Sequence, residues 1–175
     1  AHGGWGGEEA RLPGSVLLRH DARTASLRKR ITMTPRALAP DLHQQIMALA
    51  AQGDALAAEA RYEDAIKVYD RALALAPEPK NDWGASTWLL AAIGDVAFLG
   101  GWFETARKAL DHAMACPGAI GNPFLHLRRG EVALEQGDES VAADELMRAY
   151  MAERREMFAR EDAKYLAFLS TCAAL

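Results

Sequence analysis

His112 and Cys116 are the side chains with the clearest potential for chemistry, because they lie four residues apart and would share one face of a helix. A thiol beside an imidazole pairs a nucleophile with its base, and with His126 the two could also ligate a metal ion. His20 and His43 have no partner at ligand spacing. The sequence shows no glycine-rich phosphate loop, nucleophile elbow or paired-acid motif. A small thiol or metal-dependent hydrolase is therefore one alternative, supported by this pair alone.

The composition argues against several other classes of protein. Twenty Lys and Arg against 24 Asp and Glu give the 175-residue chain a formal charge of −4, which disfavours nucleic acid as a partner. Half of the residues are hydrophobic but only 7% are aromatic, as expected for an alanine-rich helical protein. Two cysteines provide no disulfide framework, and no stretch approaches the roughly 20 apolar residues of a membrane helix. These features predict a cytoplasmic protein without a membrane partner.

Residues 1–40 differ in charge from the rest of the chain. They carry seven Lys or Arg and three Asp or Glu, a local charge of +4, so residues 41–175 carry −8. The segment shows no sustained helical or strand period, which predicts a basic, flexible N-terminal arm. Because Met33 is followed by Thr34 and Pro35, translation could also start at Met33, and residues 1–32 would then not be native.

From Asp41 onward the sequence repeats. Three blocks align without gaps: each opens with glycine, has alanine twelve residues later, a large apolar residue four later, and a second alanine after three more. Small side chains at these positions let two antiparallel helices approach closely, and the large residue fills the volume beside their crossing. The columns are Gly53, Ala65, Tyr69 and Ala72 in the first block, Gly94, Ala106, Leu110 and Ala113 in the second, and Gly130, Ala142, Leu146 and Ala149 in the third.

These blocks resemble the tetratricopeptide repeat family, whose repeat of 34 residues is a helix-turn-helix unit. The first block also has the large residues Leu49 and Leu56 and the closing Pro77 of that pattern. The spacing is longer than the family's, since 41 residues separate the first two opening glycines and 36 the next two. The C-terminal half, including residues 121–124 and 165–169, is also similar to small bacterial proteins of this family linked to toxin neutralisation.

The resemblance implies an all-α fold: a right-handed, tetratricopeptide-like stack of about three helix hairpins with a C-terminal capping helix. A cap is needed because a hairpin cannot bury both of its faces alone. The alignment weakens the enzyme alternative, since Cys116 falls in the apolar column of Leu75 and His112 in the solvent-facing column of Arg71. We expect a helical domain at 41–175, with repeats at about 46–77, 87–117 and 123–152 and the cap at 153–175.

The resemblance also implies that the first helix of each hairpin lines a concave groove, the surface that such arrays use for binding. One column of this groove is wholly acidic, and an apolar strip runs beside it. Family members that hold the C-terminal carboxylate of a peptide resemble one another in placing Lys, Asn and Arg at these columns, and this chain departs from them. The predicted partner-binding residues are Asp54, Asp95 and Glu131 in the acidic column and Trp88, Phe98, Phe124 and Leu127 in the apolar strip.

An acidic groove beside apolar side chains favours a partner protein with a basic and partly apolar surface. We therefore predict a non-catalytic protein–protein interaction module that uses neither a cofactor nor a metal ion. An immunity-type toxin neutraliser is the specific candidate. A scaffold or co-chaperone subunit of a cellular complex is the alternative. No oligomeric state is predicted.

Overall fold

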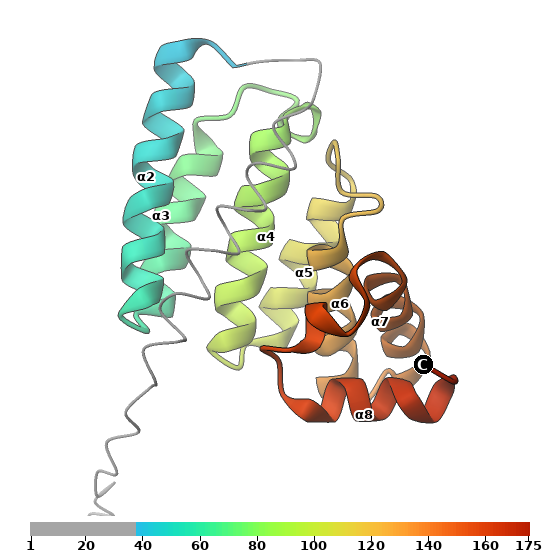
Figure 1. Ribbon diagram of the computed structural model, residues 1–175. Coiled ribbons are helices and arrows are strands. Elements are labelled where there is room, and N and C mark those ends of the chain that lie inside the picture. The colour runs from blue at the N-terminus through green and yellow to red at the C-terminus, as the bar shows by residue number, and fades with distance from the viewer. Residues whose placement is uncertain (1–37) are drawn as a thin grey trace, which may run out of the picture.

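The computed structural model describes residues 38–175, so the predicted basic arm lies, but for its last three residues, outside the described residues. The described part is all helical, as predicted (Figure 1). Two short 3₁₀ helices, η1 (Lys80–Asp82) and η2 (Arg154–Phe158), lie between α-helices. The α-helices are α2 (Pro40–Ala58), α3 (Tyr62–Ala74), α4 (Gly84–Leu99), α5 (Phe103–Met114), α6 (Pro123–Glu135), α7 (Glu139–Glu153) and α8 (Ala163–Cys172).

The helices pair in chain order as three hairpins, α2–α3, α4–α5 and α6–α7, and each hairpin packs on the next through α3 against α4 and α5 against α6. Figure 1 shows these hairpins side by side, with α8 crossing the end of the stack. This arrangement confirms the predicted tetratricopeptide-like stack. The exact repeat boundaries and the division into arm and domain remain predictions.

The opening glycine of each repeat lies where the two helices of its hairpin cross. A Cβ atom added at Gly53 would lie 2.4 Å from Tyr69 Cε1, and one added at Gly94 would lie 2.6 Å from Leu110 Cγ. At Gly130 the same atom would lie 2.6 Å from Leu146 Cγ. The paired alanines Ala65, Ala106 and Ala142 are fully buried. The predicted pairing of a glycine with a large residue sixteen positions later is confirmed in all three hairpins.

The three hairpin turns share one backbone geometry. In each, an amide donates to the carbonyl five residues earlier: Arg61 N to Leu56 O, Trp102 N to Ala97 O, and Asp138 N to Ala133 O, at 2.8–2.9 Å. This is the 6→1 bond that closes a helix end when the residue just before the donor adopts a left-handed conformation. The left-handed residues are Ala60, Gly101 and Gly137, with φ of 57°, 77° and 79°. The first repeat thus places an alanine where the other two have glycine.

Asn122 begins the third hairpin, with proline at the first helical position. Its side-chain Oδ1 accepts hydrogen bonds from the amides of Phe124 (3.0 Å) and Leu125 (3.4 Å). This cap satisfies two amides that would otherwise lack an intrahelical partner. Among residues 38–175, no helix is both long and apolar enough to span a membrane.

Candidate functional site

The predicted groove residues lie on α2, α4 and α6, the first helices of the three hairpins, but they are much less exposed than the sequence suggests. Phe98 is half-buried, and the other six are buried: Asp54, Trp88, Asp95, Phe124, Leu127 and Glu131. Asp95 and Trp88 each retain only 2% of their exposure. The sequence did not indicate this burial, and the role of these residues in binding a partner stays a prediction.

Asp54 is held within its own hairpin. The Tyr69 hydroxyl donates to Asp54 Oδ1 at 2.7 Å. The same tyrosine ring fills the space beside Gly53, so one side chain both closes the helix crossing and orients the neighbouring carboxylate. A buried carboxylate keeps its charge more easily when it accepts such a bond.

Asp95 and Glu131 are held by Arg128, a residue that the sequence analysis did not select. Its guanidinium lies 2.6 Å from Asp95 Oδ1 and 2.5 Å from Glu131 Oε2, and 3.4 Å from Glu161 Oε2. Burial lowers the pKa of Arg128, but the charges of Glu131 and Asp95 outweigh burial and raise it. Arg128 is therefore a permanent cation. The sequence feature that could have indicated Arg128 is its position three residues before Glu131 on one helix, a spacing at which side chains interact.

Arg128 also contacts the apolar strip of the groove. Its guanidinium carbon lies 4.2 Å from the centre of the Phe98 ring and 5.7 Å from that of Phe124. A cation over an aromatic face is attracted by the ring's electrons. The acidic column and the apolar strip of the second and third repeats thus meet at one buried arginine.

The C-terminal segment covers the third repeat, which explains much of the burial there. Leu127 packs in one cluster with Phe158, Tyr165 and Leu169. The Tyr165 hydroxyl donates to Glu135 Oε1 at 2.6 Å, and burial and that carboxylate raise the pKa of Tyr165. The cap therefore does more than close the end of the stack, since it returns across α6 (Figure 1).

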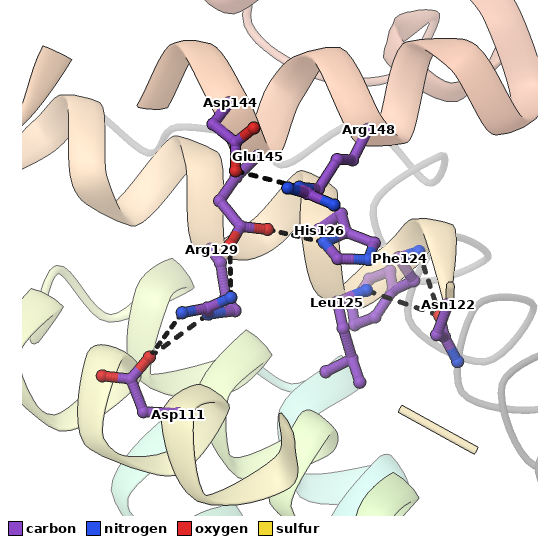
Figure 2. Close-up of polar contacts among 9 residues, drawn as sticks. All are labelled: Asp111, Asn122, Phe124, Leu125, His126, Arg129, Asp144, Glu145 and Arg148. Atoms are coloured by element: carbon purple, nitrogen blue, oxygen red, sulfur yellow. Dashed lines mark hydrogen bonds and ion pairs between the residues drawn. The ribbon is translucent and has the colours of Figure 1, made fainter. Parts of the chain in front are cut away.

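A second polar network joins α5, α6 and α7 away from the acidic column. Figure 2 shows Arg129 between Asp111 of α5 and Glu145 of α7, and Glu145 also faces His126. Arg129 Nη2 lies 3.0 Å from Asp111 Oδ1, and His126 Nδ1 lies 2.6 Å from Glu145 Oε2. These contacts connect the second and third hairpins, so His126 serves packing rather than the pair at His112 and Cys116.

His112 and Cys116 do not form a thiol–imidazole pair. The Cys116 thiol donates to the His112 backbone carbonyl at 3.5 Å, while His112 Nε2 lies 2.8 Å from Asn81 Oδ1. Burial raises the pKa of the Cys116 thiol to about 11. Within residues 38–175, no three His, Cys, Asp or Glu side chains are grouped closely enough to hold a metal ion. The geometry gives the hydrolase alternative no support.

We expect Cys116 to react with iodoacetamide at pH 8 about a hundredfold more slowly than an ordinary thiol, because each unit of pKa removes a factor of ten in thiolate. Cys172 is exposed and serves as the control in the same molecule. Mass spectrometry of peptides from a time course measures both rates. Equal rates at the two cysteines would contradict the burial of Cys116.

Similarity of the chain to a known family profile and to solved structures agrees with this fold. The sequence profile of the tetratricopeptide repeat matches residues 46–79, which include α3 and most of α2. A tetratricopeptide repeat therefore lies at residues 46–79. Among solved structures, the chain is similar to the type III secretion translocator chaperone SycD of Yersinia enterocolitica, in an alternative dimer form. The TM-score is 0.55 at 17% identity, over 73% of this chain and 91% of that one.

A second structure of SycD, in complex with a peptide of the translocator YopD, has a TM-score of 0.55 to this chain. The two are 18% identical, over 78% of this chain and 95% of that one. At such identities the similarity establishes the fold alone. No curated protein matches the chain in sequence.

Proposed function

We propose that this chain is a non-catalytic binding module that holds a cationic, partly apolar segment of another protein on the concave side of α2 and α4. The observation that carries the proposal is the fold, which it shares with a chaperone solved in complex with a peptide of its translocator. Helical-repeat arrays commonly bind through this concave side. The C-terminal segment covers the third repeat, so the first two repeats are the stronger candidates.

The charge of the site supports a cationic partner. In the described part of the groove, the four carboxylates Asp54, Asp95, Glu131 and Glu161 accompany one guanidinium, that of Arg128. Trp88, a large apolar side chain that is buried in the folded chain, lies on the same helix as Asp95. Opposite charge across an interface raises the association rate and rejects like-charged competitors.

A toxin-neutralising role is a finer alternative within the same proposal. The net charge of −8 on residues 41–175 favours it, because a toxin that acts on a polyanion presents a basic surface. The two roles differ in what is bound. A chaperone-like module holds an extended segment, whereas a neutraliser binds a folded partner and blocks its active surface.

Peptide binding tests the proposal. We expect the full chain to bind a labelled 15-residue peptide of alternating Arg and Leu, and to bind its Glu–Leu counterpart far more weakly in fluorescence polarisation. Asp54→Asn should weaken binding of the Arg–Leu peptide roughly fivefold, since about 1 kcal/mol is a typical value for one charge pair near a surface. Asparagine still accepts the Tyr69 hydroxyl, so the fold is kept.

Asp64→Asn is the matched control, because Asp64 is exposed on α3 and pairs with Arg61 at 2.8 Å. This variant should bind the Arg–Leu peptide as the parent chain does. Raising the salt concentration should weaken binding in both variants, since salt screens exposed charges. Equal affinity for the two peptides, or equal losses in the two variants, would remove the acidic concave side from consideration.

A further inference from the structure

The concave side of α4 is a covered surface in the folded chain. Fourteen consecutive residues of this helix, from Gly84 to Ala97, are buried, and Asp95 is the only charged residue in its sequence. A helix that is apolar all round must be covered on every side. Within residues 38–175, α4 packs chiefly against α3, α5, α6 and η1.

The C-terminal segment accounts for only one end of this face. Its Tyr165 ring lies 6.3 Å from the Phe98 ring, in the last turn of α4. Trp88 lies ten residues earlier on the helix, which is about 15 Å at 1.5 Å per residue. A segment that docks on the Trp88 half of the face needs apolar side chains for Trp88 and a cation for the acidic column.

The chain itself carries a segment with this chemistry. Residues 1–37 have a net charge of +4, against −8 for the rest of the chain. Their densest cationic run is Arg28-Lys29-Arg30, with Leu27 on one side and Ile31 on the other. Cations flanked by branched apolar residues match an acidic column beside a tryptophan.

The connection is long enough for this run to reach the groove. Arg30 precedes Pro40, the first residue of α2, by ten residues, and an extended chain spans roughly 33 Å over that length. Asp54 lies fourteen residues into α2, which is about 21 Å along the helix axis. A segment that turns back along α2 therefore brings Arg28-Lys29-Arg30 to Asp54 and onward to Asp95.

We infer that residues 27–31 dock on the concave side of α2 and α4, with Arg28-Lys29-Arg30 facing Asp54 and Asp95. The N-terminal segment is then a competitor, within the same molecule, for the cationic partner. The docking itself is independent of any partner, and only the competition rests on the proposed function. A tethered segment acts at a high effective concentration, so a partner must displace it to bind.

Carbodiimide cross-linking of the full chain tests the docking without a partner. The reagent joins an amine to a carboxylate as an amide. The water removed in this reaction is taken up by the carbodiimide, which becomes a urea. Lys29 is the only lysine among residues 1–37. We expect Lys29 cross-linked to Asp54, Asp95 or Glu131 in the monomer band, and this product should disappear in high salt.

The pair Lys67–Glu63, with Nζ and Oε1 2.8 Å apart on α3, is the internal positive control for the reagent. Cross-links from Lys29 found only in a dimer band would overturn docking within one molecule. So would cross-links to exposed acids of α3 or α5 alone, or a Lys67–Glu63 product without any product from Lys29.

The competition is tested with a triple charge reversal, Arg28→Glu, Lys29→Glu and Arg30→Glu. We expect it to raise affinity for the Arg–Leu peptide about tenfold. The control reverses Arg11, Arg19 and Arg23, which changes the net charge equally. An equal gain in both variants would show a general charge effect and overturn the specific docking.

The two proposals fail in different ways. Lys29 could cross-link to the groove while neither the parent chain nor the triple variant binds a cationic peptide. That result would support the docking and reject the proposed function. Peptide binding that is unchanged by the triple variant, with no cross-link from Lys29, would retain the function and reject the docking.

Discussion

Replacing Arg128 with methionine is expected to lower the free energy of unfolding by about 3–5 kcal/mol, the usual cost of removing one partner from a buried ion pair. The guanidinium is 2% exposed and holds Asp95, Glu131 and Glu161 from three separate parts of the chain. Methionine keeps much of the side-chain volume, so the loss reports mainly on charge. Urea unfolding followed by circular dichroism measures the change.

The deficit of the Arg128→Met variant should shrink as the pH falls from 7 towards about 5. Without the arginine, burial disfavours the charged forms of the Asp95 and Glu131 carboxyl groups, so the folded chain favours their protonated forms. The folded state then binds more protons than the unfolded state, so its stability increases as protons become available. A deficit that grows on acidification would contradict this assignment of the cluster.

Arg148→Met is the matched control for this substitution. Arg148 lies on α7 and pairs with Asp144 across an exposed helix face at 2.9 Å. Such solvated pairs contribute little because water and salt already screen them. The control should unfold close to the parent chain, and equal losses in the two variants would show that the Arg128 cluster has no special place in the fold.

The hairpins could be predicted from the sequence because their signals are local. Gly53 and Tyr69, sixteen residues apart, belong to one supersecondary unit, and the same spacing recurs in every repeat. Asn122 followed by proline predicts a helix start within a few residues. Such patterns need no knowledge of how distant parts of the chain meet.

The state of the groove could not be predicted in the same way. The alignment places Asp95 and Glu131 correctly on the first helices, but their burial depends on Arg128, and on Glu161 from a segment about 30 residues further along. The return of the C-terminal segment across α6 follows from no repeat, because that segment lies beyond the last hairpin. The sequence therefore indicates which helices carry the charged column but not that the column is buried.

This burial changes how the groove must be tested. A reversal to Lys at Asp95 or Glu131 would put a second cation beside Arg128 and disturb folding as well as binding. Asp54 is the better probe, since it accepts a hydrogen bond from the neutral hydroxyl of Tyr69, and asparagine preserves that bond. Within this column, Asp54 is therefore suited to tests of binding, whereas Asp95 and Glu131 report on stability.

The crossing of α6 and α7 is expected to show strong coupling between Gly130 and Leu146. Leu146→Ala should cost about 2–5 kcal/mol, because this fully buried side chain leaves a cavity. Gly130→Ala should cost about 1–3 kcal/mol despite the better helix propensity of alanine, because the new methyl meets Leu146 Cγ at 2.6 Å and its backbone nitrogen at 2.9 Å.

The double variant should cost less than the sum of the two single changes, since the methyl at position 130 enters the space that Leu146 vacates. A coupling of about 1 kcal/mol or more is expected for residues in direct contact. Ala142→Ser combined with Gly130→Ala is the control pair in the same hairpin. Because serine hardly alters the side-chain volume, the two losses in the free energy of unfolding should be closer to additive. Additivity for Gly130 and Leu146 would mean that the glycine column does not set the distance between the paired helices.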